Sequence, residues 1–334
     1  MMEKPDRDAL RRAMQAEAAE QPEASAEEKG ARSSFPSSLP CKDFLSVKYP
    51  ERVILIEPLL ALREIMMIYA DSGVGKSRFI LFLAACLAGG VNCLKWRIAA
   101  PRKVLYIDGE LPGRELQNRI LSAIKESGAD IETVGENLSI WTEDVEGTPV
   151  PILHSQRGKA ELLSRAKGFD LVVIDSMLTL MPPNGDSFKV ESANKQNDVL
   201  KELKRLGCAV IVVHHSTKSG TYYGTINHNV LTSTTISLKK IQDEIPVDGL
   251  HFSLNFEKGR SLRCNEIEPL DVSCASSRWS FRLLAQTLEE KAIALRRNTN
   301  LSQKQIAEEL GVAQGTVSKL LSKVGLSGRG SKNI

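Results

Sequence analysis

The fold is decided by the stretch IMMIYADSGVGKS, residues 65–77. Residues 65–69 are apolar without polar alternation, which predicts a strand buried on both faces of a parallel sheet. The next eight residues read ADSGVGKS, and an apolar helix is predicted over Ser77–Leu87. Strand, loop and helix in this order are the context that the pattern GxxxxGK[ST] requires, so the stretch predicts a phosphate-binding loop.

The chemistry of this loop depends on its backbone and on two side chains. Gly73 and Gly75 allow several N–H groups to point at phosphate oxygens, and the following helix adds its positive end. Lys76 is expected to reach the β- and γ-phosphates, and the Ser77 hydroxyl to ligate Mg²⁺. Ala70 stands where the first glycine belongs, which is acceptable if its φ stays negative. The alternative is a glycine-rich turn with a chance Lys-Ser. The residues expected to contact the nucleotide are Ala70, Asp71, Ser72, Gly73, Val74, Gly75, Lys76, Ser77 and Arg78.

Outward from this loop, short apolar runs alternate with helical segments. Further buried strands are predicted over 104–107, 171–174 and 209–213. Helices are predicted over Arg114–Ser127, Lys159–Ala166 and Ala193–Leu206. Such alternation indicates βαβ units and an α/β fold with a mostly parallel central sheet. Later apolar runs at 230–238, 252–256 and 279–284 lack helices between them, so the sheet is expected to end in antiparallel strands.

Acidic residues follow two of the predicted strands. Asp175 ends the run 171–174, where it would hold a Mg²⁺-bound water in the crevice at the strand ends. The alternative is an aspartate that caps the next turn. Glu110 lies just beyond the run 104–107 and is the preferred base that polarises the attacking water. Asp108 is a competing base, and Glu110 could instead be a surface loop acid.

Two further polar groups complete the candidate site. His214 and His215 follow the run 209–213 and are expected to sense the γ-phosphate, although hydrogen bonding in the core is an alternative. Zinc is not expected, because no Cys or carboxylate lies at ligand spacing. Lys258 and Arg260 are two apart on a strand, so they share a face. They are expected to reach a phosphate in a neighbouring subunit; a solvated charge pair is the alternative.

The C-terminal region resembles a helix-turn-helix over residues 301–321. Ser302 and Gln305 form a capping box, and an earlier helix over about 288–297 would complete a three-helix unit. Residues 288–334 carry 8 Lys and Arg against 4 Asp and Glu, which suits DNA as a partner. The residues expected to face DNA are Gln314, Thr316, Ser318 and Lys319. The alternative is a helical hairpin that binds protein.

The 334 residues divide by composition into four parts. Residues 1–43 are predicted to be a disordered arm, 44–285 an ATPase domain, 286–327 a helix-turn-helix domain and 328–334 a flexible tail. No apolar run reaches the ~18 residues of a membrane span, and the polar N-terminus lacks a secretory h-region. The six cysteines form no CxxC pair and are expected to be reduced thiols. A cytoplasmic protein that does not contact membranes is therefore expected.

Five motifs together resemble the RecA-fold ATPases. They are ADSGVGKS (70–77), VLYIDGELP (104–112), LVVIDS (171–176), VIVVHHSTKSG (210–220) and EKGR (257–260). Within that class the sequence is similar to hexameric plasmid replicative helicases of RepA type and their AAA_25 relatives. The resemblance implies a RecA-like P-loop core that uses ATP and Mg²⁺, with Glu110 activating water and Asp175 supporting the metal. It also implies that the histidine motif couples to DNA-facing loops and that Lys258 and Arg260 act across a ring interface.

Two functions follow as expectations. The first is an ATP-dependent DNA helicase or translocase, a hexameric ring acting in replication of a plasmid or other mobile element. The alternative is a DNA-binding regulator or recombination factor whose ATP cycle switches assembly without unwinding. A metabolic P-loop kinase is disfavoured, because no acceptor pocket is evident and a helix-turn-helix has no use there.

Overall fold

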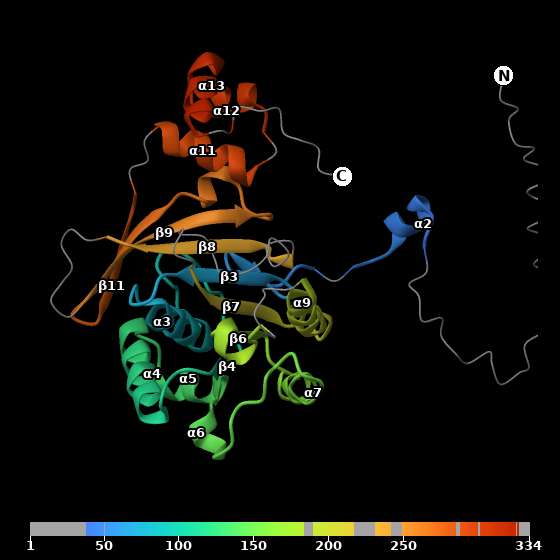
Figure 1. The fold of residues 1–334 in the computed structure, drawn as a ribbon, viewed down its shortest axis with the longest axis vertical. Helices are drawn as coiled ribbons and strands as arrows, with labels where there is room; N and C mark the ends of the chain where they lie inside the picture. Colours follow the sequence, from blue (N-terminus) through green and yellow to red (C-terminus); the bar gives the residue numbers. More distant parts are fainter. Residues whose placement is uncertain are drawn as a thin grey trace, which may run out of the picture. The chain divides into compact units, whose positions relative to one another are not determined.

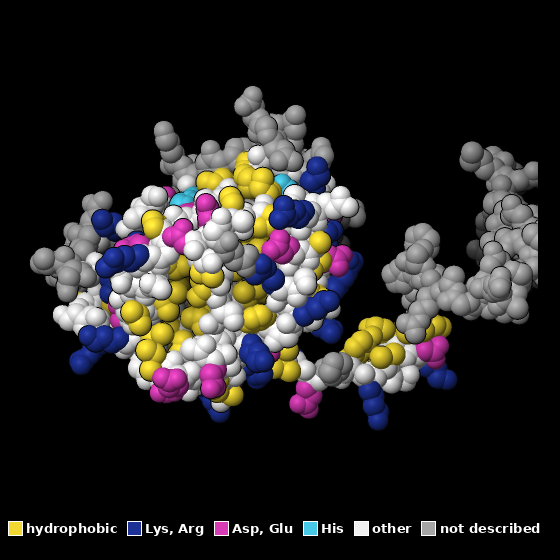
Figure 2. All heavy atoms as spheres, turned by 90° about the horizontal axis from the view of Figure 1, so that it is seen from below, with side chains coloured by type: hydrophobic (Ala, Val, Ile, Leu, Met, Phe, Trp, Pro, Cys, Tyr) yellow, Lys and Arg dark blue, Asp and Glu magenta, His cyan; other side chains and the backbone are white. Residues whose placement is uncertain are grey.

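The computed structural model describes residues 38–49, 51–183, 190–216, 231–241, 249–284, 288–299, 301–324 and 326. The chain divides into two units after Glu51. In the first, the short helix α2 (Cys41–Ser46) has no buried residue. The large apolar side chains in and beside α2 are exposed on its surface (Figure 2). Most of the predicted disordered arm, and the predicted tail 328–334, lie outside the described residues; α2 begins inside that arm, at Cys41.

The second unit is built on one sheet, with nine strands among the described residues. In chain order they are β3 (Ile65–Ala70), β4 (Val104–Asp108), β5 (Leu138–Trp141), β6 (Leu171–Asp175), β7 (Ala209–His215), β8 (Thr234–Lys240), β9 (Leu250–Gly259), β10 (Leu270–Ala275) and β11 (Arg278–Leu283). Across the sheet the order is β11-β10-β9-β8-β3-β7-β6-β4-β5. The strands from β8 to β5 pair in parallel, and those from β8 to β11 pair antiparallel. The predicted parallel sheet with an antiparallel end is confirmed.

Helices cover both faces of the parallel part (Figure 1). One face carries α3 (Lys76–Gly89), α4 (Gly113–Ser127) and α5 (Ile131–Asn137); the other carries α7 (Gln156–Arg165) and α9 (Val190–Arg205). Phe79 packs in the first core with Met66, and Leu203 packs in the second with Ile65. Since consecutive β3 residues enter opposite cores, the whole strand must be apolar. The remaining short elements are β1 (Ile54–Ile56), β2 (Leu60–Ala61), α6 (Glu143–Glu146), α8 (Met177–Leu180) and the 3₁₀ helix η2 (Cys264–Glu266).

The sheet order brings the predicted motifs together. β7 lies between β3 and β6, and β4 lies next to β6. All four strands run in parallel, so their carboxyl ends meet at one edge of the sheet. Parallel sheets bind their ligands in the crevice outside these ends. Asp175 and His215 are the last residues of β6 and β7 at this edge. The phosphate loop follows β3 there, and Glu110 follows β4.

The C-terminal residues form three helices, α11 (Leu288–Asn298), α12 (Gln303–Glu309) and α13 (Gln314–Lys323). They enclose a small apolar core of their own, and α11 also contacts β9. The predicted capping box is present: Ser302 Oγ accepts from the Gln305 N–H, and the Ser302 N–H donates to Gln305 Oε1 at 2.9 Å. Within the described part of the chain, no helix combines the length and the apolar character needed to cross a membrane.

Candidate nucleotide-binding site

The phosphate loop joins β3 to α3 through two glycines with positive φ. Gly73 has φ 78° and Gly75 has φ 101°, conformations that L side chains rarely adopt. A Cβ at Gly75 would also lie 2.6 Å from the end of the Leu250 side chain, which would have to shift, so the positive φ is the main reason for glycine there. Ala70 lies within β3, and among the described residues it is not one of those with positive φ. Its replacement of the first glycine therefore carries no conformational cost.

Lys76, the first residue of α3, folds back over the loop. It is only 7% exposed, and its Nζ donates to the carbonyl oxygens of Ala70 at 3.0 Å and Asp71 at 3.1 Å. Its Nζ also lies 3.5 Å from His215 Nδ1. Burial lowers the pKa of Lys76, and the nearby carboxylates of Asp175, Glu110 and Asp71 oppose that effect. Neutral carbonyl oxygens thus hold the Lys76 ammonium beside the loop. An anionic phosphate would bind this ammonium more strongly than they do.

Asp175 and Ser77 face each other across the crevice. Asp175, the last residue of β6, is 2% exposed. It accepts a hydrogen bond from Tyr106 Oη at 2.6 Å. Burial raises the pKa of Asp175 to about 6, an effect that the hydrogen bond from Tyr106 and the nearby Ser77 hydroxyl oppose. A hydroxyl and a carboxylate that line the same cavity match the few protein ligands that Mg²⁺ takes beside nucleotide phosphates. Among the described residues, no cluster of three or more His, Cys, Asp or Glu could hold a metal ion.

The structure separates the two candidate bases. Asp108 is buried, and its Oδ1 accepts the backbone N–H groups of Glu110 at 3.0 Å and Leu111 at 2.7 Å. Its carboxylate therefore shapes the turn after β4. Glu110 instead lines the cavity, where its Oε1 accepts from Ser176 Oγ and lies 3.3 Å from His215 Nε2. Of the two acids, Glu110 lines the cavity and Asp108 does not.

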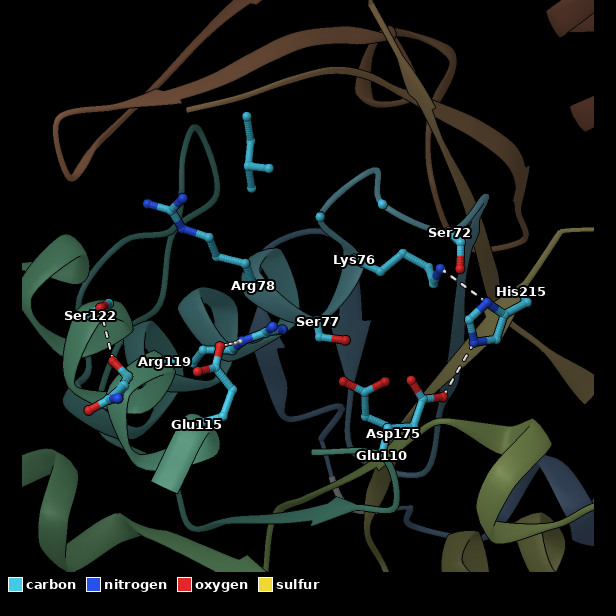
Figure 3. A pocket seen from close by; sticks show the side chains of 14 residues that line it. Ser72, Lys76, Ser77, Arg78, Glu110, Glu115, Arg119, Ser122, Asp175 and His215 are labelled. Carbon is cyan, nitrogen blue, oxygen red and sulfur yellow. Dashed lines mark hydrogen bonds and ion pairs between the residues drawn. The ribbon is translucent and has the colours of Figure 1, made fainter. Parts of the chain in front are cut away.

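The two histidines at the end of β7 lie differently. His215 lines the cavity between Lys76 and Glu110, with one ring nitrogen near each (Figure 3). His214 is 5% exposed, does not line the cavity, and its Nδ1 lies 3.1 Å from the His215 carbonyl oxygen. The predicted pair thus supplies one residue to the cavity. Residues 217–220 of the motif lie outside the described residues.

The cavity has a volume of about 630 Å³ and extends well beyond the phosphate loop. One wall is a polar face of α4 that the sequence analysis did not single out. The signal was present, since Glu115, Arg119 and Ser122 recur at helical spacing soon after Glu110. The lining residues are Ser72, Gly73, Gly75, Lys76, Ser77, Arg78, Glu110, Glu115, Asn118, Arg119, Ser122, Asp175, His215 and Leu250.

Lys258 and Arg260 do not line this cavity. β9 runs antiparallel to β8, so Leu250 reaches the phosphate-loop edge whereas Gly259 pairs with Thr234 at the opposite end. The Arg260 N–H donates to the Ser233 carbonyl oxygen, and Lys258 Nζ lies 3.4 Å from Thr232 Oγ1. Burial, reinforced by Arg260, lowers the pKa of Lys258 to about 8. The basic pair therefore lies at the far end of the sheet from its own phosphate loop.

The four residues predicted to face DNA lie on α13. Val317 and Leu321 are buried in the three-helix core, while Gln314 and Lys319 are exposed and Thr316 and Ser318 are half-buried. The first residue of α13 follows Ala313, which provides no side-chain cap. Of these four side chains, those of Gln314 and Lys319 are the more accessible.

Comparisons with known proteins agree with this architecture. A model of the family AAA_25, described as an AAA domain, matches residues 31–221, and a model of Sigma-70, region 4, matches residues 287–324. A solved structure, the KaiC-like protein PH0186 of the hyperthermophilic archaeon Pyrococcus horikoshii OT3, is similar with a TM-score of 0.49 and 16% identity. The match covers 70% of this chain and 99% of that one. No curated protein matches the sequence. With the first family model spanning more than half its length, the chain belongs to the AAA_25 family of RecA-like P-loop ATPases.

Proposed function

We propose that the protein hydrolyses Mg²⁺-ATP at this cavity and uses the energy to act on DNA as a helicase or translocase. The proposed binding residues are those of the loop from Ala70 to Arg78. Ser77 and Asp175 would hold Mg²⁺, which neutralises charge that develops on the phosphates. Glu110 would take the proton of the attacking water. The observation that carries the proposal is the convergence of Lys76, Glu110, Asp175 and His215 on one cavity.

His215 is proposed to report the state of the γ-phosphate. Its ring nitrogens lie 3.5 Å from Lys76 Nζ and 3.3 Å from Glu110 Oε1. A γ-phosphate that drew Lys76 away would change both contacts at once. Because His215 ends β7, this change would pass directly into the segment that follows. His214, which does not line the cavity, is proposed to orient that segment instead.

A ring of subunits is proposed because the basic pair lies far from its own nucleotide site. Lys258 and Arg260 are at the opposite end of the sheet, so a phosphate within their reach belongs to a second copy. In that position the guanidinium of Arg260 would stabilise charge in the transition state. The ring is proposed to be hexameric, in line with the resemblance to replicative helicases of RepA type. Arg260→Ala should then lose turnover while each subunit still binds ATP.

DNA is the proposed partner, through α13 and the residues Gln314, Thr316, Ser318 and Lys319. The proposed place of action is replication of a plasmid or other mobile element. The test is ATP turnover of the full chain with and without single-stranded DNA, followed by displacement of a labelled strand. DNA-stimulated turnover and unwinding are expected, and Lys76→Ala is the control that should abolish both. ATP turnover that single-stranded DNA does not stimulate, with no strand displacement, would contradict the proposed helicase or translocase activity.

The match of residues 287–324 to Sigma-70, region 4, favours a second candidate, an ATP-switched DNA-binding regulator or recombination factor. It predicts sequence-specific duplex binding and slow turnover. A band-shift with the full chain and random duplexes separates the two. Selection of one sequence, lost in Lys319→Ala, would support the regulator. Sequence-independent binding that is steeply salt-dependent would support the motor.

A further inference from the structure

Arg78 lies in the first turn of α3 and lines the nucleotide cavity. Its Nη2 donates to Glu126 Oε1 at 2.6 Å and to Cys274 Sγ at 3.3 Å. The Arg78 side chain is 30% exposed, whereas that of Glu126 is 0% exposed. The guanidinium is therefore fixed from behind by a fully buried carboxylate while part of it remains at the cavity wall.

The second oxygen of Glu126 is also occupied. Trp279 Nε1 donates to Glu126 Oε2 at 2.8 Å. The Trp279 ring stacks on Phe82 with centroids 4.7 Å apart and an interplanar angle of 18°. A carboxylate with both oxygens satisfied in the interior has little freedom to move. Glu126 and Trp279 together thus determine where the Arg78 guanidinium lies.

The clamp, meaning Arg78 held by Glu126 and Trp279, differs from the Arg119–Glu115 ion pair, which also lines the cavity. Arg119 Nε donates to Glu115 Oε1 at 2.9 Å, but these side chains are 39% and 50% exposed. An exposed pair of this kind holds its geometry weakly. A buried pair costs desolvation, so burying Glu126 behind Arg78 gains position rather than stability. The position gained is on the wall of the nucleotide cavity.

The cavity has two distinct ends. Glu110 and His215 lie at one end, where the γ-phosphate is proposed to sit (Figure 3). Arg78 and Ser122 lie toward the other end, away from His215. Lys76 and Ser77 serve the outer phosphates and the metal, and Arg78 is the next residue along the helix. The end with Arg78 is therefore left for the α-phosphate and nucleoside.

We propose that Arg78 binds the α-phosphate of the nucleotide, and that Glu126 and Trp279 are positioning residues that hold its guanidinium for this contact. The proposal rests on ATP binding at this cavity, as proposed above. A contact to the α-phosphate is made equally in the ground state and the transition state, because the bond that breaks is between the β- and γ-phosphates. Loss of Arg78 should therefore raise KM and leave kcat nearly unchanged.

The experiment compares three variants of the full chain by steady-state kinetics and by ADP binding. Arg78→Lys keeps the charge but loses the planar fork that serves two acceptors. It should raise KM for ATP and Kd for ADP roughly tenfold, with kcat within about twofold. Trp279→Phe keeps an aromatic ring at this position and removes the N–H donor together with the rest of the five-membered ring, so it should raise both constants roughly threefold. Arg165→Lys is the matched control, since Arg165 pairs with Glu161 at 2.9 Å away from the cavity; it should change neither.

The outcomes separate this inference from the function on which it rests. If the unmodified chain binds ATP but Arg78→Lys and Trp279→Phe retain its KM, the clamp has no role in binding and the inference is overturned alone. A fall in kcat at constant KM also overturns it. If the unmodified chain ignores Mg²⁺-ATP, both proposals fail together. A KM effect in both variants, with Arg165→Lys unchanged, supports the inference.

Discussion

Replacing Asp175 by Asn should stabilise the free protein while it removes activity. Asp175 is 2% exposed, and burial of its carboxylate raises its pKa to about 6. An asparagine at this position has the same shape and keeps an oxygen to accept from Tyr106 Oη. It carries no charge to be desolvated, so the folding cost of the buried carboxylate disappears.

The magnitude follows from the difference between the folded and the ordinary pKa of Asp175. A pKa of about 6 against 3.8 corresponds to about 3 kcal/mol, at 1.36 kcal/mol for each pKa unit. Below pH 3.8 the carboxyl is protonated in both the folded and the unfolded chain, so it costs nothing. Between 3.8 and about 6 only the folded chain keeps the proton, and the parent loses stability as the pH rises. Above about pH 6 the full cost of about 3 kcal/mol applies.

The assay is urea unfolding of the parent and of Asp175→Asn, without nucleotide or metal, at pH 4 and pH 8. The free energy of unfolding should be about 3 kcal/mol higher for the variant at pH 8 and nearly equal at pH 4. Asp130→Asn is the control: Asp130 accepts from the Thr133 N–H, its pKa is lowered, and its replacement should give no gain at pH 8. A variant no more stable than the parent at pH 8, or equally stabilised at both pH values, would refute the reasoning.

Three further outcomes are expected. Glu110→Gln should bind ATP but lose turnover by ~100-fold or more. Asp108→Asn should keep turnover, because the Asp108 carboxylate accepts backbone N–H groups of the turn after β4. Rapid-quench assays of both variants decide which acid is the base. Ser277→Gly should raise the free energy of unfolding by about 0.5–1 kcal/mol, because Ser277 has φ 60° in the two-residue turn between β10 and β11. A urea titration in which the variant is less stable than the parent would contradict this. Tyr106→Phe removes a hydrogen bond that lowers the pKa of Asp175, so the acid limb of the pH–rate profile should move up by roughly one pH unit, and an unmoved limb would exclude Asp175 as the titrating group.

The parallel part of the fold could be predicted because burial on both faces leaves a continuous apolar run. β3, β4, β6 and β7 were each recognisable in this way, and each strand is extended by one or two residues in the structure. Apart from Ala70 of β3, the extra residues are polar ones at the carboxyl ends, including Asp175 and His215. These ends belong to the sheet, which is why their side chains are held firmly enough to form a site.

Other elements could not be predicted, since their patterns depend on neighbours far away in the sequence. The alternation of apolar and polar residues in β10 is typical of a strand, but the burial of its Asp271 depends on His251 of β9 and Arg282 of β11, with which it pairs. The edge strand β5 begins where α5 ends, without a turn signal between them. The location of Lys258 likewise followed from the antiparallel pairing of β9 and β8, which no local pattern reveals.

The cavity without ligand holds its charges at a cost that the proposed ligands would relieve. Burial lowers the pKa of Lys76 and raises that of Asp175, so the charged form of each is disfavoured in the free protein. A phosphate would give the Lys76 ammonium a charged partner, and Mg²⁺ would do the same for the Asp175 carboxylate. A site organised in this way gains binding energy from charges that are already desolvated and in position. The gain in free energy of unfolding expected for Asp175→Asn therefore measures the stability that the free protein loses by keeping a charged carboxylate buried at this site.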